Sequence, residues 1–160
     1  MTTNLNLNKH SAIILQGTAV ILGHPGVGKT TVAQQIADMN PEHILIHTDD
    51  FSAHGYEQSL YALRGYLKTF PNAYFIIEGV LWYRLLRKWL EMWDFFPEHI
   101  ITVTAEDAQI AQVYLDRGKD FTKAQSMHKW NQTIWNQYMD MLLSVPDSKL
   151  PTLHTYNNDK

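Results

Sequence analysis

The sequence predicts an α/β fold in which helices cover a mainly parallel, five-stranded sheet. Short apolar runs alternate along the chain with segments whose apolar residues recur at helical spacing. Several of these runs stop at a glycine or an acidic residue, as at Gly23, Asp49 and Glu78. Strand–helix alternation implies right-handed crossovers between parallel strands. The residues that end these runs would then lie along one edge of the sheet, where ligands of such folds bind.

Apolar runs of four or five residues, bounded by turn residues, are typical of buried strands. Helices are indicated where apolar residues recur every three or four positions. Their aromatic stripes, which include Trp82, Trp89 and Trp130, are interpreted as core packing rather than base stacking. The segment 11–17 (SAIILQG) is a candidate extra strand beside 19–22, with Gly17 at a turn. The predicted strands are residues 19–22, 44–48, 74–77, 100–104 and 152–156, and the predicted helices are residues 29–39, 56–69, 81–94, 105–116 and 122–143.

The composition predicts one domain over residues 1–160, with residues 1–10 as a candidate flexible tail. The net charge of −3 provides no overall attraction to nucleic acid or anionic membrane, so nucleic acid is an allowed but not a favoured partner. The absence of cysteine excludes disulfides and thiolate metal sites, and the histidines show no metal-ligand spacing. Since no apolar run approaches the ~20 residues that span a bilayer, we expect a cytoplasmic protein without a membrane partner.

The loop from Gly23 to Thr31 (GHPGVGKTT) has the complete phosphate-loop pattern, between a predicted strand and a predicted helix. Glycines permit a backbone that turns N–H groups inward around an anion, and the helix N-terminus adds partial positive charge. Lys29 is expected to reach the β- and γ-phosphates and Thr30 to bind Mg²⁺, while His24 is given no catalytic role. The fold class is therefore a P-loop NTPase, a three-layer α/β/α sandwich. The predicted nucleotide-binding residues are Gly23, Pro25, Gly26, Val27, Gly28, Lys29, Thr30 and Thr31.

Carboxylates follow two further predicted strands. Asp49 and Asp50 end the run at 44–48, and Glu78 ends the run at 74–77. We take the strand before Asp49 to lie next to the loop strand, which would place its end beside the γ-phosphate. A carboxylate there can accept the proton of an attacking hydroxyl or hold Mg²⁺ through water. A turn or helix cap is the alternative interpretation of the Asp pair, and a helix-starting acid that of Glu78.

The chain resembles the kinase domain of phage polynucleotide kinase in its phosphate loop, in Asn40-Pro41 and in the apolar strand that ends in Asp-Asp-Phe. The wider resemblance is to P-loop nucleoside and small-molecule kinases, which include uridine kinase, nicotinamide riboside kinase and zeta toxins. An Arg that follows the Asp pair in polynucleotide kinases has no counterpart within 51–54 (FSAH). The resemblance therefore does not single out a polynucleotide 5′ end as the acceptor.

This resemblance implies roles for four residues. Asp49 would be the base toward the acceptor hydroxyl, with Asp50 supporting Mg²⁺ or acceptor binding. Glu78 would be the acid near Mg²⁺, and Arg117, which follows the predicted helix at 105–116, would be the lid arginine over the phosphates. The metal ligands implied are thus Thr30, Asp50 and Glu78, and the catalytic residues are Asp49, Lys29 and Arg117.

The acceptor is expected over residues 51–66 and 79–88. Three basic residues of the second segment share a helical face, which would attract a phosphorylated acceptor or is simply solvated. The stretch 156–159 corresponds to part of the adenine-binding loop of the related kinases. The candidate acceptor-lining residues are Tyr56, Tyr61, Arg64, Trp82, Tyr83, Arg84, Arg87 and Lys88.

These observations predict an ATP- and Mg²⁺-dependent kinase. The acceptor would be a hydroxyl of a nucleoside, nucleotide, polynucleotide end or other small molecule. As a first alternative, His10-Ser11-Ala12, Gly17, the loop and the Asp pair are similar to the HPr serine kinase/phosphorylase domain, whose partner is a protein. An ATP-binding or ATPase module without an acceptor is the second alternative.

Overall fold

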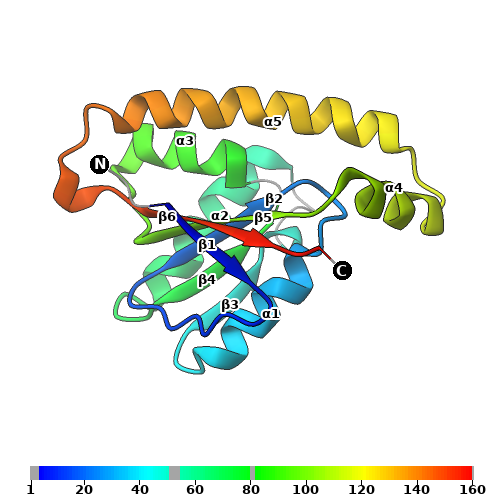
Figure 1. The fold of residues 1–160 in the computed structure, drawn as a ribbon. Coiled ribbons are helices and arrows are strands. Elements are labelled where there is room, and N and C mark those ends of the chain that lie inside the picture. The colour runs from blue at the N-terminus through cyan, green and yellow to red at the C-terminus, as the bar shows by residue number, and fades with distance from the viewer. Residues whose placement is uncertain (1–3, 51–54, 80–81, 160) are drawn as a thin grey trace.

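The computed structural model describes residues 4–50, 55–79 and 82–159 (Figure 1). No helix within these ranges is both long enough and apolar enough to cross a bilayer. In chain order the elements are β1 (Asn4–Asn8), β2 (Ala19–Gly23), α1 (Lys29–Met39), β3 (Ile44–His47), α2 (Tyr56–Thr69), β4 (Phe75–Glu78), α3 (Trp82–Trp93), β5 (His99–Thr104), α4 (Asp107–Asp116), α5 (Phe121–Leu142), a 3₁₀ turn (Asp147–Lys149) and β6 (Thr152–Asn157).

The sheet is parallel throughout and has the order β1-β6-β5-β2-β4-β3. The α/β class and the parallel pairing predicted from the sequence are confirmed, but the sheet has six strands instead of five. A second prediction was wrong: β3 does not lie next to β2, because β4 is between them. All carboxyl ends nevertheless lie along one edge of the sheet, as parallel pairing requires.

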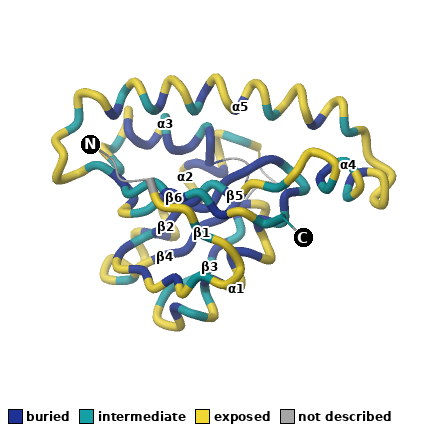
Figure 2. The backbone as a smooth tube through the Cα atoms, in the orientation of Figure 1, coloured by how far each residue is buried: buried dark blue, intermediate teal, exposed yellow. Residues whose placement is uncertain are grey.

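Helices cover the sheet on both faces, and each face has its own core (Figure 2). On one face, α2, α3 and α5 pack against Val20, Leu22 and Ile77. On the other face, α1 and α4 pack against the alternate residues of the same strands, such as Ile21 and Ile76. Because successive side chains point to opposite faces, a strand covered on both sides must be apolar throughout, which explains the continuous run in β2.

Residues 4–8, within the segment considered as a flexible tail, form an edge strand. β1 pairs in parallel with β6, from Asn4 opposite Leu153 to Asn8 opposite Asn157. Leu7 packs on the core, whereas Leu5 is 44% exposed. Two leucines among asparagines are a weak local signal, and the pairing partner lies at the far end of the sequence.

The segment 11–17 is not the extra strand that its apolar residues suggested. Ile13 and Leu15 are buried, but their backbone groups bond to one side chain instead of a strand. The Asn40 amide accepts from the Leu15 N–H (2.7 Å) and donates to the carbonyls of Ile13 and Ile36 (2.8 Å each). Because Asn40 is itself buried, these bonds satisfy an irregular segment without a sheet ladder.

The aromatic stripes are core packing, with one exception. Trp82 and Trp89 are fully buried in edge-to-face contact, with ring centroids 5.0 Å apart. Tyr138 of α5 is buried on the same core. Trp130, however, is 62% exposed, so its assignment to the buried stripe was wrong.

A buried histidine links the two strands at the β5–β6 side of the sheet. Nε2 of His154 lies 3.0 Å from Nδ1 of His99, and the His154 side chain is 7% exposed. Its Nδ1 atom has no hydrogen-bond partner among the described residues. Burial, with a smaller contribution from the charge of His99, lowers the pKa of His154 to about 4.

We expect His154 to weaken the fold in acid. Its folded-state pKa lies below the unfolded-state value of about 6.5, so the unfolded chain binds more protons between these two values. The contribution is fully present above pH 6.5 and is lost as the pH falls toward 4. Chemical unfolding at pH 7.5 and at pH 4.5 should show that His154→Leu reduces the difference in unfolding free energy by about 2 kcal/mol.

His10, which is exposed, provides the control for this measurement. His10→Gln should leave the difference between the two pH values unchanged. If His154→Leu retains the pH dependence of the unmodified protein, the assigned role of His154 in acid is wrong.

Candidate functional site

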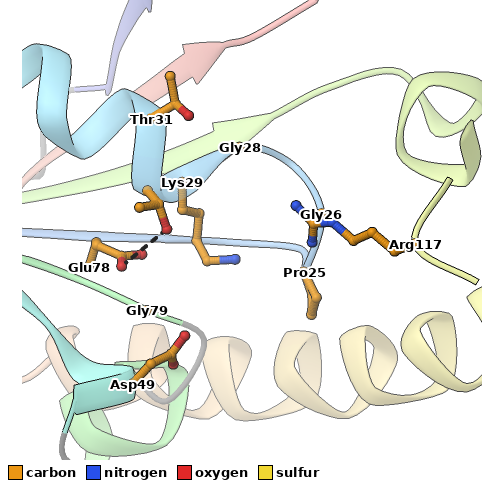
Figure 3. Close-up of a pocket in the computed structure, with 10 residues that line it drawn as sticks. Pro25, Gly26, Gly28, Lys29, Thr31, Asp49, Glu78, Gly79 and Arg117 are labelled. Carbon is orange, nitrogen blue, oxygen red and sulfur yellow. Dashed lines mark hydrogen bonds between the residues drawn. The ribbon is translucent and has the colours of Figure 1, made fainter. Parts of the chain in front are cut away.

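A cavity of about 240 Å³ opens at the carboxyl edge of the sheet (Figure 3). Its walls come from the phosphate loop, the first turn of α1, the ends of β3 and β4, and the end of α4. The residues that line it are Pro25, Gly26, Gly28, Lys29, Thr30, Thr31, Asp49, Glu78, Gly79 and Arg117. Most of the residues singled out from the sequence are therefore brought together.

The loop backbone requires glycine at two positions. Gly26 (φ +86°) and Gly28 (φ +93°) lie in the left-handed region that other residues rarely adopt. A Cβ atom on Gly26 would lie 2.8 Å from the ring of Tyr114, and one on Gly28 would lie 2.6 Å from the Asn158 amide. Torsion and space both select glycine, and the loop is packed against α4 and the segment after β6.

Lys29 is a buried cation at the floor of the cavity. Its side chain is 9% exposed, and Nζ donates to the His24 carbonyl at 3.2 Å. Burial lowers the pKa of Lys29 to about 8, against the opposing charges of Glu78 and Asp49, while Arg117 lowers it further. An anion beside Nζ would compensate for this desolvation, because opposite charge favours the protonated form.

Glu78 lies beneath the loop as a second buried charge. It is 3% exposed, and its Oε1 accepts from the Thr30 hydroxyl at 3.3 Å and contacts His47 Nδ1 at 2.7 Å. The backbone beside it is fixed by the Thr48 hydroxyl, which donates to the Glu78 carbonyl at 3.0 Å. A Cβ atom on Gly79 would lie only 1.7 Å from that hydroxyl oxygen, so no larger residue fits there.

The oxygen donors of Thr30 and Glu78 fit Mg²⁺, which prefers hard oxygen ligands and usually takes one or two of them from protein beside phosphate and water. The described residues contain no group of three His, Cys, Asp or Glu side chains able to hold a metal alone. A metal here would therefore depend on a bound phosphate. Asp50, the third ligand predicted from the sequence, is exposed and is not among the described residues that line the cavity.

Asp49 faces the cavity although β3 is one strand further from the loop than predicted. It follows β3 directly in a short 3₁₀ turn, is exposed, and lines the cavity together with Lys29. In Figure 3 its carboxylate points toward the space in front of the Lys29 ammonium. Asp49 thus shares the cavity with the loop although β4 lies between β3 and β2.

Arg117 reaches the cavity from the opposite side. It is the residue that ends α4, where its N–H donates to the Val113 carbonyl at 3.1 Å. Its guanidinium extends toward Gly26 (Figure 3). Lys29 and Arg117 thus approach the same space, and their mutual repulsion is part of what lowers the pKa of Lys29.

Two residues near the site have contacts that the sequence analysis missed. The Asn158 amide donates to the Val27 carbonyl at 2.9 Å, so the segment after β6 holds the phosphate loop. His47 contacts Glu78 across the β3–β4 pair. The sequence placed His47 near the end of a predicted strand, just before the Asp pair. It did not show the β3–β4 register that sets His47 opposite Glu78.

His24 packs against the helices instead of facing the cavity. Its ring lies 4.5 Å from the ring of His128 and 6.0 Å from that of Phe121, both on α5. That His24 has no catalytic role stays a prediction. The contact also ties the variable part of the loop to α5.

The predicted acceptor-lining residues separate into different regions. Arg84 lies over the ring of Tyr56, with Cζ 3.7 Å from the ring centroid. Arg64 instead lines a cavity with Thr18 and Phe75, at the amino ends of β2 and β4, and so faces away from the candidate site. Trp82 is core, Tyr83 is buried beside α5, Tyr61 contacts Trp93, Arg87 contacts Gln137 and Lys88 is exposed. The segments 51–54 and 80–81 lie outside the described residues.

We expect Asn158→Ala to weaken nucleotide binding without removing any group that faces the cavity. The substitution leaves the Val27 carbonyl without its side-chain donor, a loss of about 1 kcal/mol or roughly fivefold in affinity. Calorimetric titration with ADP measures this effect. Asn157→Ala is the matched control, because the Asn157 side chain bonds to Asp159 and not to the loop. Equal affinity in the two variants would contradict the proposal that Asn158 holds the phosphate loop.

No protein-family profile and no curated protein sequence matches the chain. Among solved structures, an uncharacterized protein from Eubacterium ventriosum ATCC 27560 matches with a TM-score of 0.50 at 12% identity, over 89% of each chain. A gluconokinase from Sinorhizobium meliloti 1021 is 13% identical over 88% of this chain and 82% of its own (TM-score 0.49). A sugar kinase from Janibacter sp. HTCC2649 is 16% identical over 88% and 86% (TM-score 0.49). At such identities the likeness concerns the fold alone.

Proposed function

We propose that the protein is an ATP-dependent phosphotransferase that moves the γ-phosphate to a hydroxyl group of a small molecule or nucleotide. One observation carries the proposal: a single cavity is lined by the phosphate loop, by the cations Lys29 and Arg117, and by the carboxylate of Asp49. Phosphate binding alone needs the loop and the lysine. A carboxylate that faces the same space adds a group able to receive a proton.

Binding would rest on the loop backbone and Lys29. The first N–H groups of a helix have no partner within it, and the residues at the start of α1, from Gly28 to Thr31, line the cavity. Lys29 would transfer its hydrogen bond from the His24 carbonyl to a phosphate oxygen. Mg²⁺, when bound with the nucleotide, supplies charge neutralisation for the phosphates, and Thr30 and Glu78 are the residues that would hold it.

Transfer would depend on positioning and on charge. Asp49 would accept the proton of the acceptor hydroxyl as its oxygen attacks the γ-phosphorus. Lys29 and Arg117, which approach from opposite sides, would stabilise the charge that spreads over the phosphoryl oxygens. The acceptor would lie on the Asp49 side of the cavity, toward α2 and α3.

ATP consumption in the presence of different acceptors tests the proposal. ADP release is followed with nucleosides, nucleotides, sugars, DNA 5′-hydroxyl ends and a serine-containing protein as separate acceptors. Release that rises with one acceptor, together with ³²P transfer to that acceptor, supports a kinase and identifies the acceptor class. Release that stays equally slow with every acceptor supports an ATPase module instead.

We expect Asp49→Asn to abolish transfer while nucleotide binding remains. Loss of a general base lowers turnover by about 100-fold to 10,000-fold, whereas the affinity for ADP should change little, because Asp49 is not part of the loop. Asp50→Asn is the matched control: it removes the same charge one residue further on, outside the cavity lining. We expect it to keep turnover within about threefold. An Asp49→Asn variant with full transfer would rule out its role as base.

A further inference from the structure

The contact between His47 and Glu78 connects two strand ends beneath the phosphate loop. His47 is the last residue of β3 and lies directly opposite Glu78, the last residue of β4, in the parallel register. Paired residues of adjacent strands place their side chains on the same face of the sheet. Nδ1 of His47 is 2.7 Å from Oε1 of Glu78, within the range of charge-assisted hydrogen bonds.

Glu78 depends on such a partner because its side chain is only 4% exposed. A carboxylate stays ionised in a buried position only where hydrogen bonds or an opposite charge stabilise it. The bond from Thr30 is longer, at 3.3 Å, and the same hydroxyl is the candidate Mg²⁺ ligand of the loop. Of the two side-chain contacts to Glu78 among the described residues, the one from His47 is therefore the shorter.

The geometry also determines which carboxylate oxygen of Glu78 is held by hydrogen bonds. His47 and Thr30 both bond to Oε1. No hydrogen bond to Oε2 occurs among the described residues, and Glu78 lines the cavity. An Oε1 atom that is held from β3 therefore restrains the rotamer of Glu78 and leaves Oε2 as the oxygen without a partner among the described residues.

We propose that His47 is a positioning residue that holds Glu78 in the orientation needed for Mg²⁺–nucleotide binding. The role rests on the function proposed above, since it presumes a nucleotide in the cavity. The role requires a donor at Nδ1 of His47 facing Oε1 of Glu78, and it does not require a change of charge. Partners of metal-binding side chains typically alter metal affinity by 10- to 100-fold when they are removed.

The experiment measures ADP affinity with Mg²⁺ and with EDTA, by calorimetry. His47→Ala should weaken the affinity about tenfold in Mg²⁺ and leave the affinity in EDTA unchanged, because the loop and Lys29 are intact. It should also raise the Mg²⁺ concentration needed for half-maximal binding about tenfold. Equal weakening in Mg²⁺ and in EDTA would overturn the proposal, since it would indicate general damage to the loop.

Asn and Gln provide a matched pair at position 47. The amide nitrogen of Asn occupies about the place of Nδ1, whereas the longer Gln places its amide near Nε2. We expect His47→Asn to restore Mg²⁺-dependent affinity to within threefold of the unmodified protein and His47→Gln to behave like His47→Ala. A role confined to folding would not separate these two variants, so equal behaviour of Asn and Gln would overturn the proposal.

A double-variant cycle tests whether His47 acts through Glu78. In a Glu78→Gln background, His47→Ala should change Mg²⁺-dependent affinity by less than twofold, because the group that it positions has lost its charge. Additive effects would overturn the proposal. If the unmodified protein bound ADP with Mg²⁺ but His47→Ala had no effect, only the role of His47 would fail. If the unmodified protein bound no nucleotide, the proposed function would fail first.

Discussion

The site depends on holding a cation and a carboxylate, Lys29 and Glu78, almost without solvent at the carboxyl edge of the sheet. Each would be costly to bury alone. The fold reduces this cost with the His24 carbonyl on one side and with Thr30 and His47 on the other. An anion that enters between Lys29 and Arg117 would complete the neutralisation. The charged groups of the cavity are thus already in place for a phosphate, and little reorganisation would be needed if a nucleotide bound.

The phosphate loop is supported from three directions by distant parts of the chain. Tyr114 of α4 covers Gly26, Asn158 bonds to Val27, and α5 packs its rings against His24. None of these contacts involves a group expected to touch phosphate. They explain how a short motif keeps the left-handed torsions of Gly26 and Gly28, since the loop backbone is held by its surroundings.

The strand–helix alternation, the phosphate loop and the meeting of Asp49 with Lys29 could be predicted from sequence, because each depends on local pattern or on parallel pairing. β1 could not, since its signal is two leucines and its partner is 149 positions further on, as Asn4 lies opposite Leu153. The strand suggested at 11–17 was wrong because the Asn40 amide, and not a neighbouring strand, bonds to the backbone of that segment. The role of Asp50 as a metal ligand stays a prediction: it does not line the cavity with Asp49, and both residues lie in a 3₁₀ turn, where adjacent side chains point in different directions.

The Asn158 contact has a consequence for the order in which the protein matures. β6 follows every other described element in the chain, and it is both the pairing partner of β1 and the strand that leads to Asn158. During synthesis from the amino end, Gly23–Thr31 emerges long before the residues that support it. The nascent chain therefore carries the full phosphate-loop sequence before the loop has lateral support. Pairing of β6 with β5 and β1 would bring Asn158 to Val27, so the loop would reach its supported geometry only after β6 has joined the described sheet.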